Sequence, residues 1–304
     1  MTDNVDLSVS LSGVLWKNPV TTASGTFASG KEHSEFIDIS RLGAVTVKGV
    51  SPVPWQGNPP PRVAETFGGM LNAIGLENPG VDAFIRNDLP FLRGYNTNII
   101  VNVCGHSLNE YLTVIERLAQ TDADMLELNI SCPNISAGGM AFGTDPKLTY
   151  ETVRACKTKA RQPLYVKLSP NVTSITEIAR AAEAGGADGL SLINTLLGMR
   201  IDIETRAPIL GNKTGGLSGP AILPVALRMV YQVYEAVKIP IIGMGGIMTG
   251  ADAIEFMLAG ASAVAVGTAG LIDPVAPLRV IQGIAEYLTA HGYKNPAEIV
   301  GAAH

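Results

Sequence analysis

The fold is decided by residues 240–268, which read PIIGMGGIMTGADAIEFMLAGASAVAVGT. This stretch contains two apolar runs, Pro240–Gly245 and Ala263–Thr268, and a helical pattern between them at Ala251–Leu258, which Thr249 precedes. Both runs are apolar throughout rather than at alternate positions, as is typical of parallel strands that are covered on both faces. The stretch therefore predicts one unit of strand, helix and parallel strand.

The same unit recurs along the chain. Six earlier apolar runs have the same character: Val20–Ser24, Ala44–Val50, Ile99–Cys104, Met125–Ser131, Leu164–Ser169 and Gly189–Thr195. Helical patterns between strands include Leu108–Gln120, Pro146–Ala160, Ile175–Ala184 and Pro220–Val237. Eight such units in about 250 residues predict an α/β protein, a (β/α)8 TIM barrel. A doubly wound open sheet is the alternative, and it is disfavoured because no Gly-x-Gly-x-x-Gly follows the first strand.

Three segments do not fit a plain barrel. Leu7–Trp16 alternates around a glycine and predicts an N-terminal hairpin that closes the bottom of the barrel. Ser51–Pro79 and Leu196–Ser218 are longer than simple connections, so we interpret them as long active-site loop insertions. No domain boundary is visible, and residues 1–304 are expected to form a single domain.

Composition excludes several functional classes. The net charge is −5 and no basic run occurs, which argues against nucleic-acid binding. No apolar stretch approaches ~18 residues and the acidic start is not a targeting segment, so no membrane association is expected. The 3 cysteines indicate a reducing cytoplasm and cannot form a four-cysteine cluster. The 4 histidines form no ligand cluster, so no metal site is expected.

A cysteine is the strongest candidate for chemistry. Cys132 lies in Asn129–Asn134, which reads NISCPN and follows the apolar run Met125–Leu128. A thiol at the carboxyl end of a strand can serve as a general base near neutral pH, and the flanking amides can orient a polar ring. The alternative is a small buried hydrophobic residue. We favour that alternative for Cys156, in a helical pattern, while Cys104 ends a strand and could line the barrel mouth.

The two glycine-rich strand ends predict a phosphate site. Gly243–Gly246 reads GMGG, and Gly267-Thr268 ends the next strand. Loops after the last two strands of a barrel often present backbone N–H groups to a phosphate, and glycine permits close approach. Ordinary turns are the alternative for either motif alone.

Lysines and amides complete the predicted pocket. Lys48 and Lys167 lie inside apolar runs, where an unpaired charge is costly. They are expected to face an anionic cofactor or a substrate carboxylate; a structural ion pair and a Schiff base are the alternatives. Asparagines gather near strand ends and in loops, at Asn72, Asn102, Asn129, Asn134 and Asn194. This set suits a flat heterocycle with amide edges and one negative charge.

These motifs resemble class 1 dihydroorotate dehydrogenases over nearly the whole chain. The resemblance rests on Asn129–Asn134, Met70–Asn78, Lys167–Asn171, Ile193–Thr195 and Gly243–Gly246. The segments Gly138–Pro146 and Thr214–Ala221 further resemble the catalytic subunit of class 1B. The resemblance implies oxidation of (S)-dihydroorotate to orotate in de novo pyrimidine (UMP) biosynthesis. It also implies that Cys132 removes the C5 proton while C6 delivers hydride to FMN.

The resemblance also assigns roles to individual residues. The implied substrate-binding residues are Lys48, Asn72, Ala73, Ile74, Gly75, Leu76, Asn129, Asn134, Asn194 and Thr195. The implied FMN-binding residues are Ser24, Lys48, Gly49, Asn102, Asn129, Lys167, Ile193, Gly219, Gly245, Gly246, Gly267 and Thr268. Lys167 is expected beside the flavin ring, where a cation stabilises the anionic reduced form.

For the partner, the resemblance implies an electron-transfer subunit that carries FAD and an iron–sulfur cluster and reduces NAD. A homodimer core within a heterotetramer is expected. Three alternatives remain open: a fumarate-dependent class 1A enzyme, a phosphate-binding barrel aldolase or isomerase with a Schiff-base lysine, and a non-catalytic subunit.

Overall fold

The barrel is the centre of the computed structural model, which describes residues 5–131, 133–134 and 140–304. Within this part of the chain, eight parallel strands form one sheet in the order β3-β18-β17-β12-β11-β8-β7-β4. Their bounds are β3 Val20–Thr22, β4 Ala44–Thr46, β7 Asn98–Val103, β8 Met125–Asn129, β11 Leu164–Lys167, β12 Gly189–Leu192, β17 Ile241–Met244 and β18 Ala263–Val266. All eight predicted strands are confirmed. Each strand ends one to four residues before the corresponding apolar run does, because the last residues of those runs leave the sheet at the barrel mouth.

Side chains join the two strands at the ends of this order. The backbone N–H of Thr46 on β4 donates to Thr22 Oγ1 on β3 over 3.1 Å, and Thr22 Oγ1 donates to the Thr46 carbonyl over 3.2 Å. The hydroxyls of Thr21 and Thr46 lie 3.1 Å apart. These buried threonines therefore complete the (β/α)8 barrel.

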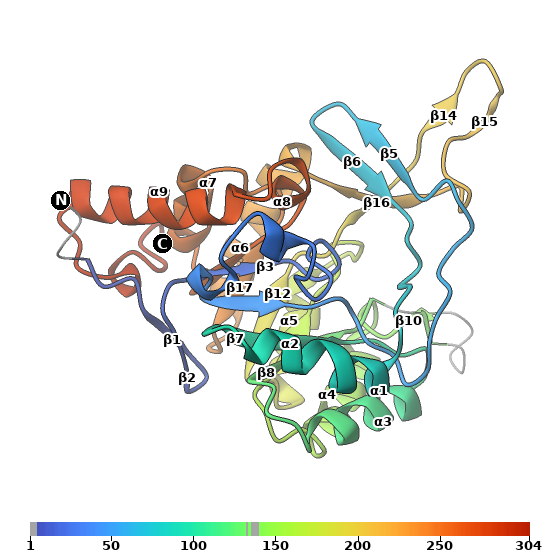
Figure 1. Cartoon of the computed structure of the whole chain (residues 1–304), viewed down its shortest axis with the longest axis horizontal. Coiled ribbons are helices and arrows are strands. Elements are labelled where there is room, and N and C mark those ends of the chain that lie inside the picture. The colour runs from blue at the N-terminus through green and yellow to red at the C-terminus, as the bar shows by residue number, and fades with distance from the viewer. Residues whose placement is uncertain (1–4, 132, 135–139) are drawn as a thin grey trace.

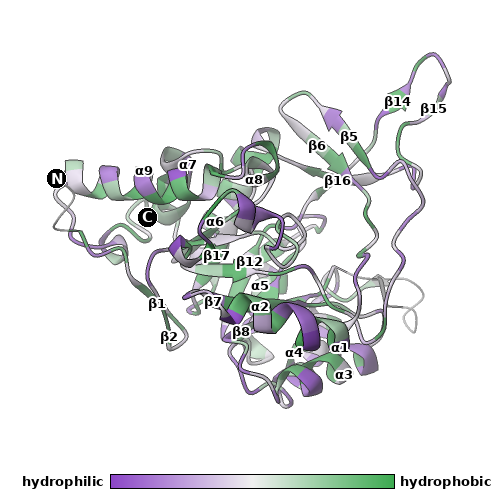
Figure 2. Ribbon diagram, in the orientation of Figure 1, coloured by the Kyte–Doolittle hydropathy of each residue, from purple (hydrophilic) through white to green (hydrophobic). Residues whose placement is uncertain are grey.

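Helices surround the strands (Figure 1). The five predicted helices are α3 Leu108–Leu118, α4 Pro146–Lys157, α5 Ile175–Ala184, α6 Leu223–Ala236 and α7 Gly250–Leu258. The expected N-caps are present, since Asp145 Oδ1 accepts from the N–H of Leu148 and Thr249 forms a capping box with Asp252. The barrel strands form a hydrophobic interior, while the helices carry hydrophilic residues outward (Figure 2).

The structure adds helices outside the predicted set. They are α1 Val81–Ala83, η3 Phe84–Asp88, α2 Leu89–Arg93, α8 Thr268–Ile272 and α9 Ala276–His291. The described residues also form single 3-10 turns: η1 His33–Glu35, η2 Ile39–Arg41, η5 Pro220–Ile222 and η6 Pro296–Glu298. Among the described residues, no helix combines the length and apolarity that crossing a bilayer requires.

The N-terminal hairpin is confirmed. Strands β1 Val9–Leu11 and β2 Val14–Trp16 pair antiparallel. Leu11 and Trp16 are fully buried among residues at the amino-terminal ends of the barrel strands, including Met125 and Tyr165. The hairpin therefore closes the bottom of the barrel, and Trp16 packs in its core.

The two long insertions are more ordered than predicted. They were expected as loops, but they form a four-stranded antiparallel sheet, here called the lid, in the order β13-β16-β6-β5. Its strands are β5 Val63–Thr66, β6 Gly69–Asn72, β13 Leu196–Gly198 and β16 Gly215–Ser218. Figure 1 shows the lid at the end of the molecule opposite the β1–β2 hairpin, with β14 Ile201–Asp202 and β15 Ala207–Pro208 projecting beyond it. One more short pair, β9 Pro133–Asn134 and β10 Met140–Ala141, follows β8.

Candidate active site

A cavity of about 490 Å³ lies between the carboxyl ends of the barrel strands and the lid. Every predicted site residue whose side chain the structure describes lines it: Ser24, Lys48, Gly49, Asn72, Ala73, Ile74, Gly75, Leu76, Asn102, Asn129, Lys167, Ile193, Asn194, Thr195, Gly219, Gly245, Gly246, Gly267 and Thr268. Cys132 lies outside the described residues, and Asn134 is described only through its backbone in β9. Their predicted roles therefore rest on the sequence.

The floor of the cavity contains a buried cation. Lys167, the last residue of β11, is 4% exposed and donates from Nζ to Ser24 Oγ over 3.0 Å. Its ammonium also lies 3.6 Å from Glu127 Oε1 on the adjacent strand β8. Lys167 thus forms a buried ion pair and also lines the cavity, while its role toward an anionic ligand stays a prediction.

A second cation lines the same cavity. Lys48 follows β4, and burial lowers the pKa of its ammonium. The nearby positive charge of Lys167 lowers this pKa further, while Cys104 and Glu77 act in the opposite direction. Two lysines close enough to influence one another favour an anionic ligand, since a negative charge between them relieves their repulsion.

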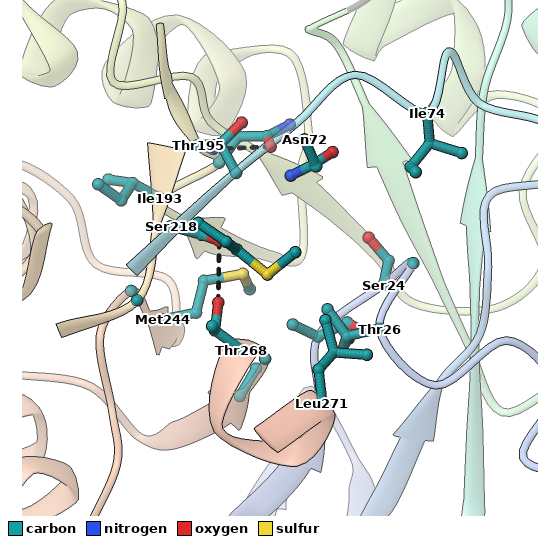
Figure 3. A pocket seen from close by; sticks show the side chains of 18 of the residues that line it. Ser24, Thr26, Asn72, Ile74, Ile193, Thr195, Ser218, Met244, Thr268 and Leu271 are labelled. Atoms are coloured by element: carbon teal, nitrogen blue, oxygen red, sulfur yellow. Dashed lines mark hydrogen bonds between the residues drawn. The ribbon is translucent and has the colours of Figure 1, made fainter. Parts of the chain in front are cut away.

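Amide side chains from three parts of the chain line the same cavity. Asn194 Nδ2 donates to Ser131 Oγ over 3.0 Å, and the N–H of Ser131 donates to Asn129 Oδ1 over 3.2 Å. On the lid, Asn72 Nδ2 lies 3.4 Å from the carbonyl of Gly216 on β16. Figure 3 shows Asn72 and Thr195 on the side of the pocket opposite Thr268. The cavity thus offers both donors and acceptors to a polar ring.

The glycine-rich end of the cavity is built by β17, β18 and the lid. Gly245 and Gly246 have φ of +128° and +82°, a region that favours glycine. Thr268 Oγ1 donates to Ser218 Oγ of the lid over 2.9 Å, the bond drawn in Figure 3. These backbones and hydroxyls suit an anionic group better than an apolar one.

The structure gives a further reason for glycine at position 245. The missing side chain was expected to leave room for a phosphate, and a Cβ there would in addition lie 2.7 Å from the Cβ of Ala226 on α6. At Gly246 a Cβ would lie 2.6 Å from the Cβ of Leu223. Close packing of α6 and the positive φ therefore require both glycines.

Sequence reasoning missed one important residue, Glu127. Its carboxylate is 2% exposed in the middle of β8 and accepts hydrogen bonds from Asn102 and Ser191. The signal was present, since an acid inside a buried apolar run is as unusual as the two lysines. Lid residues Val63, Met70 and Ser218 also line the cavity and were not predicted.

Comparisons with known proteins identify the family of the chain. The family model of dihydroorotate dehydrogenase matches residues 6–288. A protein of Alkaliphilus metalliredigens named "Dihydroorotate dehydrogenase B (NAD(+)), catalytic subunit" is 62% identical over 298 residues, covering 98% of this chain and 99% of that protein. A protein of the same name from Geobacter sulfurreducens is 55% identical, covering 98% of each chain.

A solved structure supports the fold. The dihydroorotate dehydrogenase of Eimeria tenella in complex with ferulenol superposes with a TM-score of 0.82, covering 98% of this chain and 89% of that one, at 24% identity. At 24% identity, this similarity supports the fold alone. Family membership follows instead from the matched family model and the full-length relatives, and the chain belongs to the dihydroorotate dehydrogenase family.

Proposed function

We propose that this chain is the FMN-binding catalytic subunit of a class 1B dihydroorotate dehydrogenase, a single barrel domain over residues 1–304. It oxidises (S)-dihydroorotate to orotate in de novo pyrimidine biosynthesis. The observation that carries the proposal is the convergence of Lys48, Lys167 and four asparagines on one cavity at the carboxyl ends of the strands. Relatives more than half identical over the whole chain support the same reaction.

The cavity suits FMN in size and chemistry. Its volume of about 490 Å³ is within the range of cofactor sites, roughly 300–1,000 Å³. Lys167 supplies a buried cation for the ring, and the Gly245–Gly246 and Gly267–Thr268 backbones would hold the phosphate. When bound, FMN accepts the hydride that leaves C6 of the substrate.

The remaining residues bind the substrate and move its proton. Lys48 would pair with the substrate carboxylate, while Asn72, Asn129 and Asn194 would bind the ring amides. We assign Asn134 and the 73–76 loop to the same task. Cys132 would take the proton from C5 as the C5–H and C6–H bonds break and the C5=C6 bond forms.

Electrons must then leave the subunit. We propose a second subunit with FAD and an iron–sulfur cluster as their route to NAD, because this chain has 3 cysteines and no dinucleotide fingerprint. The word "subunit" in the names of the relatives supports such a partner. A homodimer core within a heterotetramer, located in the cytoplasm, completes the proposal.

The visible spectrum tests this function directly. The purified chain is expected to be yellow, and anaerobic dihydroorotate is expected to bleach the flavin absorbance. Orotate serves as the negative control: it is already oxidised and should not bleach the flavin. A colourless chain that cannot be reconstituted with FMN would overturn the proposal.

A further inference from the structure

Glu127 occupies an unusual position beneath the cavity. Its Oε1 accepts from Asn102 Nδ2 over 2.6 Å, and its Oε2 accepts from Ser191 Oγ over 2.7 Å. The Lys167 ammonium lies 3.6 Å from Oε1. Asn102 and Lys167 line the cavity, whereas Glu127 lies behind them in the barrel interior. The carboxylate thus connects four neighbouring strands: β7, β8, β11 and β12.

Stability alone does not explain this arrangement. The side chains of Glu127 and Lys167 are 3% and 5% exposed, so both charges have lost nearly all contact with water. Replacing a buried ion pair by well-packed apolar residues is often neutral or stabilising. The same face of β8 accommodates an apolar residue, since Met125, two positions before Glu127 in the strand, is fully buried in the barrel interior. A functional reason for the pair is therefore needed.

The carboxylate controls two cavity-lining groups. Because an ionised carboxylate only accepts hydrogen bonds, it turns Nδ2 of Asn102 toward itself. The Asn102 carbonyl oxygen is then directed elsewhere and lies 3.9 Å from Cys104 Sγ. Glu127 also holds the Lys167 ammonium together with Ser24, and its negative charge offsets part of the positive charge that Lys167 presents to the cavity.

We propose that Glu127 is a positioning residue that sets the midpoint potential of the flavin through Lys167 and Asn102. The inference rests on the proposed function, because it needs FMN in the cavity. A full positive charge beside the ring favours the anionic reduced flavin. Glu127 moderates that preference, so that the flavin can accept hydride and still pass electrons onward.

The test is the midpoint potential of the FMN-loaded chain and its Glu127→Gln variant. Glutamine retains the shape and an acceptor oxygen but removes the charge. We expect the potential to rise by about 30 mV or more, which corresponds to a tenfold shift of a two-electron couple toward the reduced form. The KM for dihydroorotate should change little, because Glu127 does not line the cavity. Glu116→Gln is the matched control, since Glu116 is an acid of α3 that pairs with Lys159 at the surface.

A second pair of variants guards against misfolding. Glu127→Gln leaves the Lys167 ammonium buried without its counter-charge, so Lys167→Gln and the double variant are measured as well. Lys167→Gln should lower the potential, and adding Glu127→Gln to it should raise the potential by less than in the parent, because the effect of Glu127 is transmitted in part through Lys167. An unchanged or lower potential on removing Glu127 from the FMN-containing parent, or an equal rise in both backgrounds, overturns the inference. A parent chain that binds no FMN instead refutes the proposed function.

Discussion

The hydroxyl of Tyr111 on α3 donates a 2.7 Å hydrogen bond to the backbone carbonyl of Asn129, the last residue of β8. Tyr111 is fully buried, and its ring meets that of Phe142 edge to face at 5.1 Å. The following residues lead to Cys132. Helix α3 thus fixes the strand end from which the proposed catalytic segment starts.

Tyr111→Phe is expected to destabilise the fold, because it leaves the buried Asn129 carbonyl without this donor. The expected loss in the free energy of unfolding is about 1–2 kcal/mol. Chemical denaturation of the parent and the variant measures it. Tyr150→Phe is the control, since the Tyr150 hydroxyl bonds Arg154 at an exposed site and should change stability by less than about 0.5 kcal/mol. Equal losses in the two variants would contradict the role of the buried bond.

Lys48→Met should weaken orotate binding by about one to two powers of ten, because a charge-assisted bond to the carboxylate is lost. In the parent, affinity should fall as pH rises through the depressed pKa of Lys48, below the ordinary value of 10.5. The variant should lack that pH dependence. Titration calorimetry with orotate across alkaline pH measures both effects. A parental pH profile in the variant would show that another group binds the carboxylate.

The same substitution should stabilise the ligand-free protein. Because burial lowers the pKa of Lys48 in the folded state, the folded chain holds this proton less tightly than the unfolded chain does. The protonated lysine therefore costs stability at neutral pH. The cost decreases as pH rises above the depressed pKa of the folded state, and it is gone above the ordinary pKa of 10.5. Lys48→Met should raise the thermal midpoint at pH 7, with a smaller gain at alkaline pH. A lower midpoint at pH 7 would contradict this assignment of sign.

The barrel could be predicted from sequence because each strand carries its own signal. A run such as Ala263–Val266 is buried on both faces and reads as apolar throughout. The lid has no such signal, since its strands Gly69–Asn72 and Gly215–Ser218 are rich in glycine and polar residues. Its pairing of Gly216 with Asn72 joins positions far apart in the sequence, so only the folded chain shows it.

The site was predictable to a similar degree. Residues such as Lys167 and Asn102 could be found because a charge or an amide at a strand end is conspicuous and strand ends converge in a barrel. The role of Glu127 was harder to predict than those of Lys167 and Asn102. Its role depends on the register between neighbouring strands, which places Glu127 beside Asn102 on β7 and beside Tyr165 on β11. Register of that kind cannot be read from one sequence.

NAD reduction by the isolated chain is expected to be slow. The subunit can take hydride from dihydroorotate, but we propose that onward transfer needs the FAD and iron–sulfur partner. Adding that partner should restore dihydroorotate-dependent NADH formation, measured by the absorbance of NADH. Fumarate serves as the comparison acceptor. Efficient NAD reduction without a partner would contradict the proposal, and rapid fumarate reduction would place the chain in class 1A.

Cys132→Ser tests the proposed base. A free thiol has a pKa near ~8.5, so it is ionised for a useful fraction of time near neutral pH, whereas a serine hydroxyl is far less acidic. The variant should retain FMN and bind orotate, because Lys48, Asn129 and Lys167 are unchanged. It should reduce the flavin about two to four powers of ten more slowly, the usual contribution of a positioned general base.

The measurement is the rate of anaerobic flavin bleaching by dihydroorotate from neutral to alkaline pH. Residual activity of Cys132→Ser should need a higher pH than the parent. Cys156→Ser is the matched control: this thiol is buried in α4, burial raises its pKa to about 12, and it is therefore protonated at neutral pH. That variant should bleach at the parental rate. Near-parental bleaching in Cys132→Ser would show that the base lies elsewhere, and Cys104 beside Asn102 would be the next thiol to replace.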